Sequence, residues 1–179
     1  KTYTFHLRPG IQWSDGSTLV AADFVASWKR VLTPATGSDY ASQLFIVRGA
    51  RGFYDGIQHD DFSSVGALAV DDQTLRVELE NPTPYFIDLC SFATLSPVHL
   101  PTIAKHGTAW ARPGRIVCNG AYLLEDWRLD ERILLRKNPL YWKGLPSPVP
   151  VDSIPNIQRR GALFSVFISF CHSYSFSLQ

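Results

Sequence analysis

Two pairs of adjacent carboxylates are the first residues in this chain whose type could support catalysis. They are Asp60 with Asp61, and Asp71 with Asp72. A hydrolase that works with two carboxylates needs both to converge on one bond, about 5 to 10 Å apart, with pKa values that differ. Adjacent residues on an extended chain point to opposite faces, so neither pair converges naturally. We therefore interpret all four as solvated turn residues, and no motif supports a hydrolase.

The histidines and cysteines are not spaced as metal ligands or catalytic nucleophiles. The chain has no HExxH, CxxC, GxSxG or phosphate-loop string. Pro101 falls between His99 and His106 and breaks any helix that would align them. We expect histidines at the surface or at helix caps, cysteines as small buried apolar residues, no metal, no cofactor and no enzymatic activity. The residues concerned are His6, His59, His99, His106, His172, Cys90, Cys118 and Cys171.

The composition is that of an ordered globular chain. Of its 179 residues, 45% are hydrophobic and 18% are charged. The net charge of +1 excludes a chain-wide basic field, so we expect no nucleic-acid partner. The longest apolar stretch, residues 161–171, is too short to span a bilayer as a helix. The chain has no methionine, and Lys1 leads into a strand-like run without a signal-peptide pattern, which predicts a piece of a longer polypeptide.

Hydrophobic periodicity predicts a mixture of short strands and helices. Apolar and polar residues alternate over residues 3–7, as in a strand. Phe24, Trp28, Val31 and Leu32 share one face of a helix over Ala21 to Leu32. Further elements are an interrupted helix over residues 43–54, a hairpin over 68–79, helices over 85–92 and 101–107, and a hairpin joining 121–128 to 132–137.

Tyr40 is the most suggestive single residue, because it lies in a polar loop after the first helix. A tyrosine on a loop offers a flat apolar face and a hydroxyl at low entropic cost. That combination suits recognition of a peptide backbone. Most loop tyrosines pack locally, however, so the residue alone does not define a binding site.

An ordered set of short strings resembles one family, the extracytoplasmic oligopeptide-binding proteins of ABC transporters (solute-binding protein family 5). The resemblance covers residues 1–152 and is closest to periplasmic oligopeptide and murein-peptide binders. Each string is weak alone, whereas the set in family order is specific. The strings are Tyr3–Arg8, Trp13–Gly16, Asp23–Val25 with Ser27–Trp28, Tyr40–Ser42, Pro84–Phe86, Ser96–Val98, Asn119–Tyr122, Glu131–Ile133, Lys137–Pro139 and Tyr141–Trp142.

The resemblance implies a mixed α/β fold that is part of lobe I of a periplasmic-binding-protein type II fold. Residues 1–118 match the accessory domain of the first lobe, and residues 119–152 match the hairpin that returns to that lobe. Residues 153–179, rich in Ser and Phe, form an atypical tail without family resemblance. Two departures affect local structure: Val20 stands where the family often has a capping Thr or Ser, and Cys118 stands where Thr is common.

The resemblance also implies a function without chemistry, namely capture of oligopeptides for import. Its expected partners are an oligopeptide ligand and an ABC permease in the inner membrane, and its expected location is periplasmic or extracytoplasmic. Tyr40 inherits a peptide-binding role by motif match, and Ala41 and Ser42 do so more weakly. We expect a fragment that is binding-incompetent alone, because half a cleft cannot desolvate a peptide from both sides. The alternative is a non-binding remnant or scaffold domain of a truncated gene product.

Overall fold

The computed structural model describes residues 1–57, 61–129, 131–144 and 176–178. These residues pack as two compact units. The sheet unit comprises residues 1–9, 20–98 and the last strand, and the hairpin unit comprises residues 10–19 and 99–144. The predicted tail, residues 153–179, lies outside the described residues except for 176–178.

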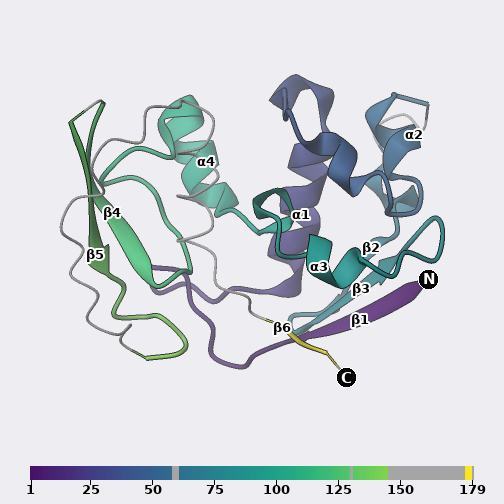
Figure 1. Cartoon of the computed structure of the whole chain (residues 1–179), viewed down its shortest axis with the longest axis horizontal. Coiled ribbons are helices and arrows are strands. Elements are labelled where there is room, and N and C mark those ends of the chain that lie inside the picture. Colours follow the sequence, from purple (N-terminus) through teal and green to yellow (C-terminus); the bar gives the residue numbers. More distant parts are fainter. Residues whose placement is uncertain (58–60, 130, 145–175, 179) are drawn as a thin grey trace. The chain divides into compact units, whose positions relative to one another are not determined.

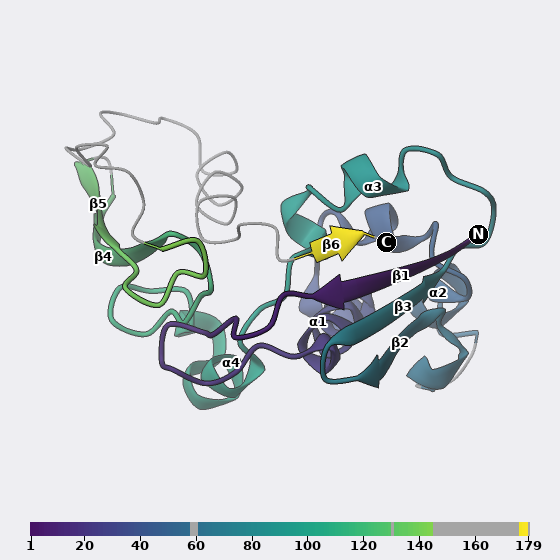
Figure 2. The ribbon, with the colours of Figure 1, turned by 90° about the horizontal axis from the view of Figure 1, so that it is seen from below.

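The sheet unit is built on four antiparallel strands in the order β2-β3-β1-β6 (Figure 2). They are β1 (Thr2–Leu7), β2 (Ala67–Asp71), β3 (Thr74–Glu78) and β6 (Phe176–Leu178). Phe5 on β1 lies opposite Leu75 on β3, and both side chains are buried. Thr4 lies opposite Arg76, and both are exposed. The predicted strand and first hairpin are confirmed, because alternation fixes which residues face the core.

Helix α1 (Ala21–Leu32) packs on this sheet and has the predicted bounds (Figure 1). Phe24, Trp28 and Leu32 are buried on its inner face. Val20 at the N-cap has no side-chain oxygen to accept a helix amide. Instead the Val20 N–H donates to the Asp23 carboxylate at 3.0 Å, which is one half of a capping box. The side-chain half of the capping box is absent, as expected where Val20 replaces a capping Thr or Ser.

The remaining helices of the sheet unit are short. The predicted helix over 43–54 divides into two parts because Gly49 has a positive φ of 71°, which residues other than glycine rarely adopt. The predicted helix over 85–92 is also shorter than expected. The observed elements are η1 (Pro34–Thr36), η2 (Ala41–Leu44), α2 (Ala50–Tyr54), η3 (Phe62–Ser64), α3 (Phe86–Leu89) and η4 (Ala93–Leu95).

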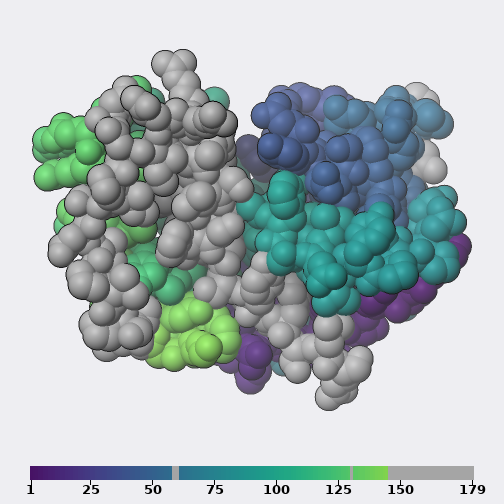
Figure 3. Space-filling view, viewed as in Figure 1, coloured from purple at the N-terminus to yellow at the C-terminus, as the bar shows by residue number. Residues whose placement is uncertain are grey.

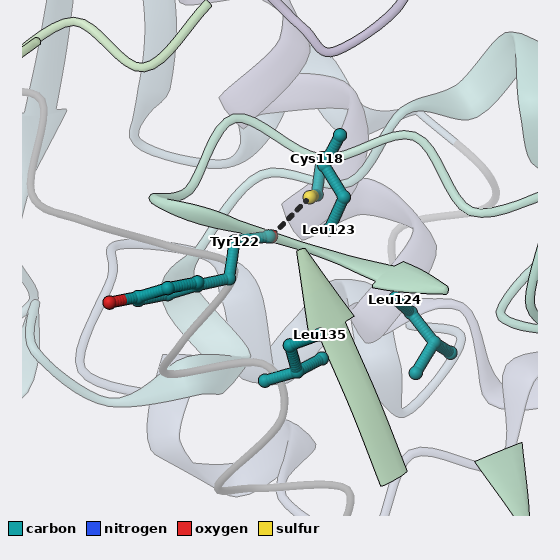
Figure 4. Packing of buried hydrophobic residues seen from close by; sticks show 5 residues of the cluster. All are labelled: Cys118, Tyr122, Leu123, Leu124 and Leu135. Carbon is teal, nitrogen blue, oxygen red and sulfur yellow. Dashed lines mark hydrogen bonds between the residues drawn. The ribbon is translucent and has the colours of Figure 1, made fainter. Parts of the chain in front are cut away.

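The hairpin unit contains α4 (Leu100–His106), η5 (Gly107–Ala109), and the antiparallel pair β4 (Tyr122–Arg128) and β5 (Arg132–Lys137). The second predicted hairpin is therefore confirmed. Its small core contains Leu124 opposite Leu135 (Figure 4). The buried Cys118 thiol donates to the Tyr122 carbonyl at 3.5 Å, so the sulfur makes a contact that a threonine hydroxyl could also make. Within the described residues, no helix is long and apolar enough to cross a membrane.

Candidate ligand-binding site

Tyr40 lies at the end of a tightly turned loop that follows α1. Thr33 ends the helix, and Gly37 closes the next turn with a positive φ of 62°. Tyr40 then occupies the N-cap position of η2, and the residue is 55% exposed. The neighbouring side chains of Ala41 and Leu44 are almost fully buried and anchor η2 to the unit. The loop therefore presents a large aromatic ring to solvent from a fixed base.

The three predicted site residues differ in what they offer a ligand. Tyr40 and Ser42 are exposed, whereas Ala41 is only 3% exposed. A ligand could contact the Tyr40 ring and the Ser42 side chain, but the Ala41 methyl group lies in the core. Any contribution from Ala41 would have to come from its backbone. The peptide-binding role of all three remains a prediction.

Phe92 contacts the Tyr40 ring and was not singled out by the sequence. The ring centroids lie 5.3 Å apart and the planes meet at 73°, an edge-to-face arrangement. Phe92 is partly buried and directly precedes η4. In Figure 3, the blue surface of the Tyr40 loop and α2 adjoins the teal surface of α3 and η4.

Helix α1 holds the segment around η4 by two side-chain hydrogen bonds. The buried Trp28 Nε1–H donates to the Leu95 carbonyl at 2.8 Å. The Val98 N–H donates to Ser27 Oγ at 2.9 Å, and that hydroxyl donates to the Asp23 carbonyl at 2.6 Å. Through these hydrogen bonds, Ser27 and Trp28 hold the segment that carries Phe92 against α1.

Other strings from the sequence also meet one another in space. Tyr3 and Phe5 pack on Phe86, with centroid distances of 4.9 and 6.0 Å. In the hairpin unit, the Ser14 N–H donates to the Cys118 carbonyl at 2.8 Å. The Asn138 amide donates to the Gly120 carbonyl at 2.7 Å. These strings therefore pair with one another within each unit and support its fold.

His99 forms a buried polar contact that the sequence did not predict. It occupies the N-cap position of α4, as expected of a cap histidine, but is only 8% exposed. Its Nδ1 lies 2.7 Å from Thr102 Oγ1, and its Nε2 lies 3.6 Å from Asp15 Oδ2. Partial burial opposes ionisation of Asp15, but hydrogen bonds from Ser17 and the nearby His99 hold the pKa of that carboxyl below its ordinary value. The arrangement stabilises the Trp13–Gly16 turn.

Asp61, Asp71 and Asp72 of the acidic pairs are exposed, as the sequence predicts for solvated acids, and Asp60 lies outside the described residues. Asp61 caps η3 through Ser63, and Asp71 accepts from the Gln73 N–H. These hydrogen bonds lower the pKa of both carboxyls. Burial raises the pKa of the Cys90 thiol to about 12, so it is not a thiolate at neutral pH. No group of acids, histidines and cysteines in the described part of the chain could hold a metal ion.

Residues 1–157 match the family model for bacterial extracellular solute-binding proteins, family 5 Middle. The chain belongs to this family. Its family 5 relatives are solute-binding proteins, not enzymes. The mixed helix and strand architecture is that of a lobe of the OppA-type periplasmic binding proteins, as the sequence predicts.

Two curated relatives of this family 5 chain come from Escherichia coli K12. The probable deoxycholate-binding periplasmic protein YgiS is 45% identical over 143 residues, which are 79% of this chain and 26% of YgiS. The periplasmic oligopeptide-binding protein OppA is 44% identical over 146 residues, 80% of this chain and 26% of OppA. The chain therefore spans about a quarter of the length of these relatives.

A solved structure of Haemophilus influenzae OppA in complex with the peptide RPPGFSPFR is similar to this family 5 chain. The TM-score is 0.75 at 39% identity, over 80% of this chain and 28% of that one. YgiS and OppA of Escherichia coli are both named as periplasmic proteins. This chain is therefore similar to Haemophilus influenzae OppA in both fold and sequence.

Proposed function

We propose that this chain contributes one wall of a ligand site in an extracytoplasmic protein that captures oligopeptides for import through an ABC permease. The observation that carries the proposal is family 5 membership together with relatives named as oligopeptide-binding proteins. In the same proposal, residues 1–118 form the accessory domain of the first lobe and residues 119–152 form the return hairpin. The wall is the surface of Tyr40 and Ser42, with Ala41 behind it.

Peptide capture fits the exposed chemistry of this surface. A tyrosine hydroxyl can donate to or accept from a peptide backbone, and its ring can cover apolar atoms of the ligand. Neither group is specific for one side chain, which suits a binder of varied peptides. Because one wall excludes water from only one side of the ligand, we expect a Kd on the order of 1 mM or weaker, about −4 kcal/mol.

Deoxycholate is the second candidate ligand, because YgiS carries that name and shares 45% identity with this chain. A steroid would use the flat apolar face of Tyr40 and would need few hydrogen bonds. Peptides are favoured because OppA matches at almost the same identity, 44%, and because the likeness to a peptide complex extends to the three-dimensional structure.

NMR titration of the isotope-labelled chain separates the two ligands. Tri- to pentapeptides are added in one series, and deoxycholate below its micelle-forming concentration is added in another. We expect saturable shifts at Tyr40 and Ser42 with peptide, unchanged in Tyr85→Ala and at least about fivefold weaker in Tyr40→Ala. Tyr85 is the matched control because it is also an N-cap tyrosine and is 59% exposed.

Each other result has a defined meaning. Shifts with deoxycholate and none with peptide would replace the peptide by a steroid as the ligand. Micromolar peptide affinity would contradict the expectation that the chain binds weakly alone. No shift at residues 40–42 at the highest soluble peptide concentration would favour a non-binding scaffold.

A further inference from the structure

We propose that Phe92 is a positioning residue that fixes the orientation of the Tyr40 ring for ligand contact. The proposal rests on the proposed function and deepens it. The two residues are 52 positions apart in the sequence, yet their rings meet edge to face at 5.3 Å. Tyr40 is 55% exposed, so its inner side is the part that Phe92 can restrain.

Both ends of this contact are attached to the same helix. The Tyr40 loop leaves α1 directly at Thr33, where Thr33 Oγ1 donates to the Lys29 carbonyl at 2.8 Å. The Phe92 segment is clamped to α1 through Trp28 and Ser27. Because α1 is packed on the sheet, both rings are carried by segments that are tied to one packed helix. An unsupported surface tyrosine would instead sample several rotamers.

The restraint matters for binding because ordering a side chain has an entropic cost. Immobilising one rotamer-rich side chain on association costs about 0.5–1.5 kcal/mol. A tyrosine already held against Phe92 has lost most of that freedom before the ligand arrives. Removing the aromatic ring at position 92 should therefore weaken peptide binding about threefold to tenfold, with Tyr40 itself unchanged.

The sequence explains why a phenylalanine suits this position. The α3 segment continues beyond Leu89 as tight turns, with the Ser91 N–H donating to the Asp88 carbonyl and the Phe92 N–H to the Leu89 carbonyl. These turns bring residue 92 out of the helix register and toward the loop. A flat ring then fills the space beside Tyr40 without a polar group that would need a partner.

The test combines ring NMR with peptide titration of the whole chain. Tyrosine-labelled chain is prepared unaltered and as Phe92→Leu, Phe92→Tyr and the matched control Phe45→Leu, whose ring pairs with Tyr54 at 5.2 Å. Tyr40 signals are assigned with Tyr40→Phe. We expect Phe92→Leu to remove the ring-current shift of Tyr40 and weaken peptide affinity about threefold to tenfold. Phe92→Tyr should retain both properties, and Phe45→Leu should change Tyr54 alone.

Two results would overturn the proposal: an unchanged Tyr40 signal in Phe92→Leu, or a changed signal with unchanged peptide affinity. If Phe92→Leu does not fold, as judged by circular dichroism, Phe92→Met replaces it. If no ligand perturbs Tyr40 in the unaltered chain, the proposed function fails separately. In that case, the ring-current shift of Tyr40 alone decides whether Phe92 orients the Tyr40 ring.

Discussion

Ser27 connects two segments of the sheet unit through a single hydroxyl. It is 1% exposed, donates to the Asp23 carbonyl and accepts from the Val98 N–H. A buried amide that loses its acceptor costs about 1–3 kcal/mol. The residue thus supports the segment that carries Phe92 without contacting any ligand.

We predict that Ser27→Ala lowers the free energy of unfolding by about 1–3 kcal/mol, because Val98 then has no hydroxyl to donate to. Chemical denaturation followed by tryptophan fluorescence measures the change. The control is Ser42→Ala, which removes an exposed hydroxyl and should change stability by less than about 0.5 kcal/mol. Equal stability of Ser27→Ala and the unaltered chain would show that the clamp does not support the fold.

Asp15 links stability of the hairpin unit to pH. Its folded pKa lies below the ordinary value of 3.8, since Ser17 hydrogen bonds and His99 outweigh partial burial. A depressed folded pKa contributes stability above the unfolded pKa, and that stability is lost as the pH falls through the folded pKa. The loss therefore belongs to the acid range below about pH 4.

We predict that Asp15→Asn is less stable than the unaltered chain at neutral pH and that its stability falls less steeply below about pH 4. Denaturant midpoints measured from about pH 2 to 7 test this, with the exposed turn residue Asp72→Asn as the control. If the stability of Asp15→Asn and of the unaltered chain depended on pH in the same way, the lowered pKa of Asp15 would be contradicted.

Single residues differ in how far the sequence could predict their place. Tyr40 was predicted at an exposed loop position because polar neighbours and the end of a helix are local signals. The burial of His99 depends in part on a residue far away in the sequence, because the Trp13 ring packs against it with centroids 5.2 Å apart. The contact between Tyr40 and Phe92 has no local signal, because both segments are placed by α1.

Gly66, directly before β2, is required by close packing of the backbone. A Cβ atom there would lie 2.5 Å from the Glu78 carbonyl oxygen and 3.1 Å from the Arg48 Cβ. The Gly66 N–H also donates to the Arg48 carbonyl at 2.8 Å, and its carbonyl accepts from the Glu78 N–H at 2.7 Å. The three segments can approach this closely only without a side chain at position 66.

We predict that Gly66→Ala destabilises the chain by about 1–3 kcal/mol, because backbone atoms must shift to admit the methyl group. Thermal and denaturant unfolding measure the effect. Leu68→Thr, two residues further along on β2, is the control, since Leu68 is 48% exposed and its replacement should be nearly neutral. A neutral Gly66→Ala would mean that the Glu78 strand can move without cost.

Elements with strong local patterns were predicted well, and those shaped by packing were not. Helix α1 has a clear apolar face and a proline directly beyond its end, so both bounds were correct. Helix α3 was predicted to continue to Phe92, but it ends at Leu89. The residues that follow form tight turns, and this allows Phe92 to reach Tyr40. The helix periodicity of the sequence therefore continues beyond the end of the observed helix.

At the scale of the whole molecule, the chain matches part of a family 5 solute-binding protein, and the ligand surface that we propose lies on the sheet unit. The family could be predicted from sequence because its short strings occur in order, although the structure shows that most of them hold the fold together. Two tyrosines of these strings, Tyr40 and Tyr85, remain exposed, and Tyr40 is the one to which the motif match gives a ligand role. The central claim is therefore that peptide contacts this surface and not the other exposed apolar side chains.

Photo-cross-linking tests that claim most directly. A tripeptide with a central benzoylphenylalanine is irradiated with the chain, and the modified residues are mapped by mass spectrometry, with unlabelled peptide as competitor. We predict competed cross-links within residues 40–42, strongly reduced in Tyr40→Ala and retained in Tyr85→Ala. Competed cross-links at Leu68 and Val70, which are 48% and 55% exposed on β2, with none near Tyr40, would contradict the account.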